Sequence, residues 1–209
     1  MKIVLATGNA GKVRELSALL ADHAIELSPQ SEFGVPEAEE TGLTFIENAI
    51  IKARNAAAHT HLPAIADDSG LEVDALGGAP GVYSSRFAGP GATDALNNAR
   101  LLAELAGLPP GQRTARFRCL AVYLRHKNDP APIIAEGVWE GVILDAPHGA
   151  NGFGYDPLFF LPACNCTSAE LPPEVKNSLS HRGQALRVLA ERLRGESAHI
   201  ADFPIQPKT

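Results

Sequence analysis

The chain has 209 residues and a formal net charge of −6, with 45% hydrophobic and 20% charged residues. These values are typical of one globular domain, which can have two lobes, and they allow a sizeable buried core. The negative charge argues against a general nucleic-acid-binding protein, because such proteins are usually basic. It does not exclude an anionic small molecule, since a few cations and a metal ion can dominate a single cleft.

The three cysteines, Cys119, Cys164 and Cys166, are too few for a disulfide framework. The chain opens directly on residues 3–6, an apolar run that predicts a strand, and shows no signal-peptide pattern. No apolar run is long enough to span a bilayer. We therefore expect a cytoplasmic protein without membrane association.

A glycine-rich loop, residues 7–12, follows the first strand and precedes a helical pattern that begins at Val13 and runs to about residue 21. A loop in this position directs backbone N–H groups at an anion, and Lys12 adds a full positive charge. It is not a Walker A loop, because Val13 stands where a serine or threonine would hold magnesium. A triphosphate bound here would therefore need magnesium held elsewhere.

An acidic segment, residues 28–42, ends before Thr44 and Glu47, which form a capping-box pattern. This pattern predicts a helix that runs to about residue 59. Three polar side chains lie one turn apart along that helix: Asn48, Lys52 and Asn55. Their spacing alone favours a solvated face.

The stretch Ala66–Gly70 carries two adjacent carboxylates, Asp67 and Asp68, between the apolar residues 62–65 and the strand-like residues 71–73. Asp, Ser and Gly favour turns, so the residue types predict a tight turn between two strands. The same carboxylates, or those of Glu39 and Glu40, could instead hold Mg²⁺, which takes one or two carboxylates plus substrate phosphate. Both interpretations are open at this point.

A long loop, residues 77–91, precedes a helix predicted from about Thr93 to Ala106. Two long strands follow at 113–125 and 133–144, and we expect them to pair as a hairpin. Gly137 and Gly141 in the second strand predict bulges. The mixture of helices and strands favours a mixed sheet.

Three cations, Lys176, His181 and Arg182, lie near the start of the last predicted helix, which runs from about Ser180 to Arg194. Cations are disfavoured at that end by the helix dipole, so they indicate an anionic or acceptor-rich ligand. A surface basic cluster is the alternative. In the turn before them, Phe153 and Tyr155 could face a purine base or pack in the core.

Six motifs in register then indicate a family. In order along the chain they are Thr7–Lys12, Glu39–Ala49, Ala66–Leu71, Gly77–Ser84, Phe153–Pro157 and Ser180–Gly183. Over about residues 1–194 the chain closely resembles the inosine/xanthosine triphosphate pyrophosphatases.

This resemblance implies an elongated α/β fold with a long mixed central sheet flanked by helices, and a substrate cleft between two lobes. Residues 1–195 would form this domain, residues 196–209 would be a tail, and the protein would be a homodimer. The implied reaction is Mg²⁺-dependent hydrolysis of noncanonical purine nucleoside triphosphates (ITP, dITP, XTP) to the monophosphate and pyrophosphate, which cleanses nucleotide pools.

The resemblance also implies roles for individual residues. Asp68 would be the catalytic base, and Glu40 and Asp68 would hold the metal. Asp67, Lys52 and Asn48 would support the site, with Asp67 reaching the metal through water. The substrate contacts would be Thr7, Gly8, Asn9, Ala10, Gly11, Lys12, Ser69, Phe153, Gly154, Tyr155, Asp156, Lys176, His181 and Arg182.

The hydrogen-bonding groups of the purines predict how the site selects the nucleobase. Hypoxanthine and xanthine present an acceptor, O6, where adenine presents an amine, so donors on His181 and Arg182 favour the former. Guanine also carries O6, and its exclusion needs a contact at C2, for which we expect a backbone N–H. Two alternatives stay open: a Maf-type pyrophosphatase acting on pyrimidine or modified nucleotides, and a nucleotide-binding sensor without catalysis.

Overall fold

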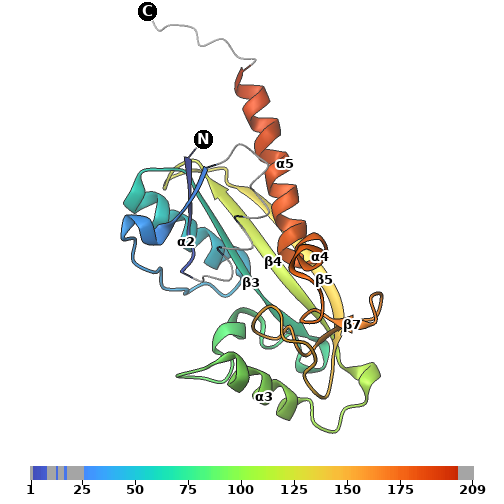
Figure 1. The fold of residues 1–209 in the computed structure, drawn as a ribbon. Helices are drawn as coiled ribbons and strands as arrows, with labels where there is room; N and C mark the ends of the chain where they lie inside the picture. The colour runs from blue at the N-terminus through green and yellow to red at the C-terminus, as the bar shows by residue number, and fades with distance from the viewer. Residues whose placement is uncertain (1, 9–12, 14–16, 18–25, 202–209) are drawn as a thin grey trace, which may run out of the picture.

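The computed structural model describes residues 2–8, 13, 17 and 26–201, and it is drawn in Figure 1. Two sequence predictions fall outside these residues: the phosphate contacts of Asn9 to Lys12, and most of the helix predicted from Val13 to residue 21. Residues 202–209 of the predicted tail also lie outside them.

A mixed seven-stranded sheet forms the centre of the structure, as the sequence predicted, with the strand order β2-β1-β3-β4-β5-β6-β7. The two strands beside β1 run parallel to it, and every other neighbouring pair is antiparallel. The predicted hairpin is confirmed as the β4–β5 pair. The strands are β1 (Lys2–Leu5), β2 (Glu26–Pro29), β3 (Ala64–Val73), β4 (Thr114–Leu124), β5 (Ile133–Ile143), β6 (Phe159–Leu161) and β7 (Cys166–Thr167).

The predicted turn at Ala66–Gly70 is wrong, because β3 passes through these residues as one uninterrupted strand. All ten residues of β3 are paired one-to-one with β4, so the strand continues through the stretch without a break. The turn propensity of Asp, Ser and Gly yields here to sheet pairing. Because successive side chains of a strand point to opposite faces, Asp67 and Asp68 lie on opposite sides of the sheet.

Two helices cover the two faces of the sheet, with α2 on one side and α5 on the other (Figure 1). The last helix continues past the predicted end at Arg194 and through residue 201, so residues 196–201 are helical. Within the described residues, no helix combines the length and the apolar character needed to cross a membrane. The helices are α2 (Phe45–Thr60), α3 (Asp94–Glu104), α4 (Pro173–Leu179) and α5 (His181–Ala201), with 3-10 segments η2 (Gln30–Phe33), η3 (Asp74–Leu76), η4 (Gly81–Arg86) and η5 (Pro110–Gln112).

The predicted capping box at the start of α2 is confirmed. The Glu47 N–H donates to Thr44 Oγ1 at 3.3 Å, and Glu47 Oε2 accepts from the Thr44 N–H at 2.9 Å. These bonds satisfy donors that the first helical turn leaves without partners. They also fix where the helix starts, and therefore which of its side chains face the sheet.

The alternation of β3 and β4 divides the core. Ile65, Cys119 and Ala121 pack against α5, whereas Ala66 and Val122 pack against α2. A third cluster lies at the other end of the sheet, where Leu101 and Leu105 of the α3 region meet aromatic residues of β4, β5 and β6. The sheet is thus covered on both faces near Asp67 and Asp68, which buries both carboxylates.

The predicted bulges at Gly137 and Gly141 are wrong, because β5 is paired with β4 one-to-one through both positions. The reason for these glycines is close approach. A Cβ on Gly137 would overlap the His181 carbonyl oxygen and lie 2.7 Å from the Ala185 nitrogen, and one on Gly141 would lie 2.6 Å from the Phe159 ring. Gly137 therefore allows the first turn of α5 to rest directly on the sheet.

We predict that Gly137→Ala lowers the free energy of unfolding by about 1–3 kcal/mol, because the added methyl group forces α5 away from β5. The measurement is the urea midpoint of wild type and variant. Gly111→Ala is the matched control, since a Cβ there meets nothing within 4 Å and it should leave the midpoint unchanged or raise it slightly. Equal midpoints for Gly137→Ala and wild type would refute the close-approach explanation.

Candidate active site

A cleft of about 340 Å³ lies beside the middle of β3, and most of the predicted site residues line it. Two predicted residues, Asp67 and Asn48, lie next to the cleft without lining it. The lining residues are Ala6, Thr7, Gly8, Gln30, Glu37, Ala38, Glu40, Lys52, Asp68, Ser69, Gly70, Val82, Ser84, Ser85, Asp94, Asn97, Phe117, Phe153, Gly154, Tyr155, Asp156, Lys176, His181 and Arg182.

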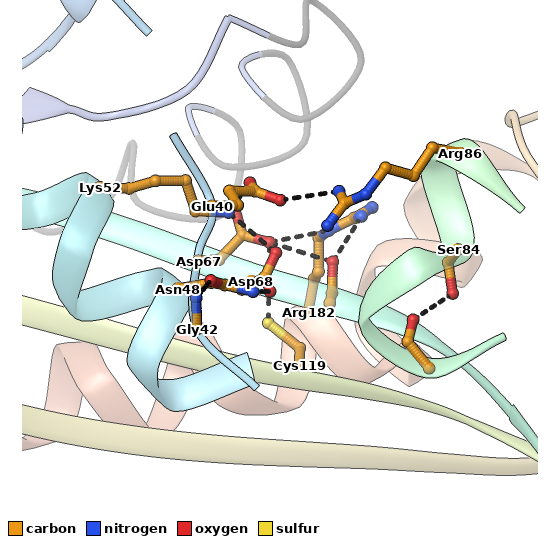
Figure 2. A network of polar contacts seen from close by, with 12 residues as sticks. Glu40, Gly42, Asn48, Lys52, Asp67, Asp68, Ser84, Arg86, Cys119 and Arg182 are labelled. Atoms are coloured by element: carbon orange, nitrogen blue, oxygen red, sulfur yellow. Dashed lines mark hydrogen bonds and ion pairs between the residues drawn. The ribbon is translucent and has the colours of Figure 1, made fainter. Parts of the chain in front are cut away.

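One end of the cleft holds two carboxylates bridged by a lysine. Lys52 Nζ donates to Asp68 Oδ1 at 2.8 Å and to Glu40 Oε1 at 2.9 Å (Figure 2). Lys52 projects from α2, Asp68 from the middle of β3, and Glu40 from the loop before α2. The ammonium thus joins three segments and holds the two carboxylates close together.

The polar stripe of α2 is not a solvated face, contrary to its spacing. Asn48 is fully buried, and its Nδ2 donates to Asp68 Oδ2 at 3.3 Å while its Oδ1 accepts from the Gly42 N–H at 2.8 Å. The Asn55 Nδ2 donates to the Pro36 carbonyl at 2.7 Å. The stripe therefore faces the sheet and the loop before α2, so both oxygens of Asp68 are oriented by α2 side chains.

Electrostatic attraction keeps Lys52 charged. Burial by itself would lower the pKa of Lys52, but attraction to Asp68, Asp67 and Glu40 outweighs burial, and the pKa lies above its ordinary value. The lysine is therefore a resident cation between two carboxylates. A cation is what two neighbouring carboxylates need, because they otherwise repel each other.

Arg86 of η4 reaches Glu40 from the opposite side of the cleft. Its Nη1 lies 3.4 Å from Glu40 Oε2, and its guanidinium carbon lies 5.2 Å from the centre of the Tyr83 ring. The sequence analysis gave neither residue a role. Figure 2 shows Arg86 approaching the Glu40–Lys52 group from the η4 side. The contact joins the long loop at 77–91 to the acidic end of the cleft.

On the other face of β3, Asp67 and Ser69 meet Arg182 of α5. The Arg182 Nε lies 3.4 Å from Asp67 Oδ2, and its Nη2 donates to Ser69 Oγ at 2.9 Å. Asp67 is only 1% exposed. The structure thus places Asp67 beside Arg182 rather than on the Glu40–Asp68 side of the strand (Figure 2).

The basic residues Lys176, His181 and Arg182 are no more than 6% exposed, so they do not form a surface cluster. Lys176 lies in α4, and the other two begin α5. The two helices meet at Ser180, whose Oγ accepts from the Gly183 N–H at 3.2 Å in the manner of an N-cap. This sharp junction directs all three side chains into the cleft.

Asp156 organises the basic end. Its Oδ2 accepts from Lys176 Nζ at 2.8 Å and from the Phe153 N–H at 2.9 Å, and its Oδ1 accepts from Ser168 Oγ at 2.6 Å. Gly152 has a φ of +77°, and a Cβ there would overlap Asp156 Oδ2. The backbone therefore closes around a single buried carboxylate.

Aromatic rings surround the basic end. The ring centre of Phe153 lies 5.0 Å from Lys176 Nζ and 5.1 Å from the Arg182 guanidinium carbon. The His181 ring stacks on Phe117, with centres 4.8 Å apart and planes 13° apart. Tyr155 packs in the core, and its hydroxyl donates to the Ser84 carbonyl at 2.8 Å. Burial first, and then the nearby Asp94, raise the pKa of Tyr155.

Several cleft residues were missed by the sequence analysis. Ser84, Ser85, Asp94 and Asn97 come from η4 and α3, and Phe117 comes from β4. Polar residues in a loop and a helix start carry no local signal for a site. Only the alternation of β4, which directs Phe117 to the same face as Ser69, could have indicated that side chain.

The acidic end offers two neighbouring carboxylates, the kind of oxygen donor that a hard divalent metal ion takes. Among residues 2–8, 13, 17 and 26–201, no group of three or more His, Cys, Asp or Glu residues could hold a metal ion. Glu40 and Asp68 supply two hard oxygen donors already gathered around a cation. Magnesium often takes one or two carboxylates and completes its shell with water and phosphate oxygen. The residues present therefore fit a metal shared with a phosphorylated ligand.

The sequence model of the Ham1 family matches residues 3–192. This match covers most of the chain and all of the cleft residues. The chain therefore belongs to the Ham1 family.

Relatives and solved structures agree with this family. The chain is 66% identical to the dITP/XTP pyrophosphatase of Thioalkalivibrio sulfidiphilus over 195 residues, which are 93% of this chain and 100% of that protein. It is 60% identical to the dITP/XTP pyrophosphatase of Escherichia coli O157:H7 over 92% of this chain and 98% of that one. A HAM1 protein from Coxiella burnetii has the same fold, with a TM-score of 0.87, 53% identity, and coverage of 93% and 99%.

We predict that Lys52→Met lowers the free energy of unfolding at pH 7 by about 3 kcal/mol, because Glu40 and Asp68 would then face each other without the ammonium. Adding Mg²⁺ should recover part of this loss in the variant, with a larger rise in Tm than in wild type. Lys127→Met, which removes an exposed lysine, is the control. If Mg²⁺ raises the Tm of all three proteins equally, the idea that a metal can replace this ammonium fails.

Proposed function

We propose that this protein hydrolyses noncanonical purine nucleoside triphosphates, such as dITP, ITP and XTP, to the nucleoside monophosphate and pyrophosphate. The relatives named dITP/XTP pyrophosphatase, at 60–66% identity over nearly the whole chain, support this activity. The observation that carries the proposal is the division of one cleft into two ends, one with paired carboxylates and one with buried cations and aromatic rings.

The basic end suits a purine that carries an oxygen at C6. Lys176 and Arg182 can only donate hydrogen bonds, and both are held by carboxylates beside the Phe153 ring. Adenine would present an amine to these donors, and a site that leaves donors facing donors can reject the wrong base by ~10⁴-fold. Phe153 offers a flat face on which the base can stack.

The acidic end suits the phosphates. Thr7 and Gly8 line the same cleft as Glu40 and Asp68, and the glycine permits close approach of the backbone. The adjoining residues Asn9 to Lys12 complete this loop in the proposal. Glu40 and Asp68 would hold Mg²⁺, which when bound would neutralise phosphate charge.

Asp68 is the catalytic base in this proposal. Its two oxygens are oriented by Lys52 and Asn48, so the carboxylate has a defined direction at the edge of the cleft. A water molecule beside it attacks the α-phosphorus and gives its proton to Asp68, while the bond from that phosphorus to the bridging oxygen breaks and pyrophosphate leaves. Lys52 offsets the negative charge that the substrate brings to this end.

The other properties expected from the sequence also belong to this proposal. We expect a homodimer in the cytoplasm that binds neither nucleic acid nor membranes. Light scattering after size-exclusion chromatography tests the dimer, and a gel shift with duplex and single-stranded DNA tests the absence of nucleic-acid binding.

The decisive experiment measures pyrophosphate release from a panel of purine and pyrimidine triphosphates. We expect turnover of dITP, ITP and XTP with Mg²⁺, none after chelation, and at least ~10²-fold lower kcat/KM for ATP and GTP. A preference for pyrimidine triphosphates would favour the Maf-type alternative. Tight nucleotide binding without pyrophosphate release would favour the sensor.

We predict that Asp68→Asn lowers kcat by about 10²–10⁴-fold, because the amide cannot take the proton from water. Tripolyphosphate binding, measured by calorimetry in the absence of Mg²⁺, should stay within about threefold of wild type, since Thr7 and Gly8 are untouched. Asp145→Asn, which changes an exposed carboxylate, is the control. A kcat within a factor of three of wild type would remove Asp68 from the role of base.

A further inference from the structure

Helix α3 binds both backbone polar groups of one residue in the loop that carries Phe153. The Gly154 N–H donates to Asp94 Oδ2 at 2.7 Å, and the Gly154 carbonyl accepts from Asn98 Nδ2 at 2.9 Å. Asp94 and Asn98 are four residues apart and therefore lie on the same face of the helix. Both polar groups of one backbone residue are thus bound by one helix about 60 residues away in sequence.

The helix does not need these contacts for its own stability. Thr93 already caps α3, because its Oγ1 accepts from the Leu96 N–H at 3.3 Å. An acid in the first turn interacts favourably with the helix dipole wherever its side chain points along that turn. The orientation of Asp94 toward Gly154 therefore serves the loop rather than the helix.

The residue that α3 binds, Gly154, has a backbone that would otherwise be conformationally free. Gly154 has a φ of +61°, and glycine loses more backbone freedom on folding than any other residue. Its neighbour Phe153 provides the ring that lies over Lys176 and Arg182. The Asp156 carboxylate accepts a hydrogen bond from the Phe153 N–H within the loop, and α3 binds the next residue, Gly154. Together they fix the backbone on both sides of the Phe153 side chain.

Helix α3 is itself held by hydrogen bonds to a neighbouring segment of the chain. Asn97 Oδ1 accepts from the Ala88 N–H at 2.7 Å, and its Nδ2 donates to the Ser85 carbonyl at 3.1 Å. Tyr155 bonds to the Ser84 carbonyl in the same segment. Helix α3, the segment at 84–88 and the Phe153 loop are therefore joined to one another by hydrogen bonds.

We propose that Asp94 and Asn98 are positioning residues for base recognition, which act through Gly154 to hold the Phe153 ring where a purine stacks. This inference rests on the proposed function for the identity of the base. It concerns affinity for the base and leaves phosphate binding untouched.

Binding can be measured without turnover. Trp139 is the only tryptophan of the chain, and its ring centre lies 6.5 Å from that of His181 at the basic end. Its emission therefore reports on inosine monophosphate, which carries the base. Tripolyphosphate, followed by calorimetry with Mg²⁺, is the matched ligand without a base.

We expect Asp94→Ala to weaken inosine monophosphate binding about 10-fold and Asn98→Ala about threefold, because the first removes a charge-assisted bond and the second a neutral one. Both should leave the Kd of tripolyphosphate within twofold of wild type. Glu104→Ala is the control, since it changes an exposed acid at the far end of α3 and should alter neither Kd.

A double variant separates positioning from direct contact. In a Phe153→Ala background, Asp94→Ala should have no further effect on the Kd of inosine monophosphate. A full additional loss would mean that Asp94 touches the ligand itself, and would overturn the proposal. Equal weakening of both ligands, or wild-type binding of the monophosphate by both single variants, would also overturn it.

The failure of the proposed function gives a different result. If wild type binds inosine monophosphate but releases no pyrophosphate from ITP, the proposed reaction is wrong and the positioning role is still decided by the two Kd values. If wild type releases pyrophosphate and the α3 variants bind as it does, the positioning role alone is wrong.

Discussion

The site depends on the uninterrupted pairing of β3 with β4. A strand directs successive side chains to opposite faces, so Asp67 and Asp68 are joined by one peptide bond and yet serve different sides of the sheet. Asp68 meets Lys52 of α2, and Asp67 meets Arg182 of α5. A slip of one residue in this pairing would exchange the two faces and dismantle both ends of the cleft. The sheet register is therefore the constraint that places Asp68 with Lys52 on one face of β3 and Asp67 with Arg182 on the other.

The buried charges around this strand are arranged as networks rather than as isolated pairs. Lys52 has two carboxylate partners, and Asp156 has one cation and two neutral donors. Removing charges from water costs several kcal/mol per ion, and such networks stabilise a fold only when nearly every polar atom is bonded. Their presence here is better explained by the ligand than by stability: they hold cations and carboxylates at defined positions along one cleft. The same reasoning explains why α3, which lines the cleft with Asp94 and Asn97, is tied to the Phe153 loop.

Local patterns predicted much of this architecture. The capping box placed the start of α2, the two apolar runs placed the β4–β5 hairpin, and the mixture of elements indicated a mixed sheet. The predictions that failed were those that depended on contacts with segments distant in sequence. The stretch at Ala66–Gly70 has turn residues but pairs as a strand, the α2 stripe looked solvated but faces Asp68, and Gly137 marks contact with α5 rather than a bulge. In each case the outcome was decided by a residue from a distant segment, which a local sequence pattern does not include.

By itself the sequence determined the chemical content of the site: which carboxylates, cations and aromatic rings the chain brings, and in which motifs they occur. The tertiary structure alone decided how they are shared between two faces, that Lys52 bridges Glu40 and Asp68, that Asp67 lies beside Arg182, and that α3 binds the backbone next to Phe153. The physical reason is that side-chain chemistry is a property of each residue. Burial, partners and orientation arise only when strands and helices distant in sequence pack against one another.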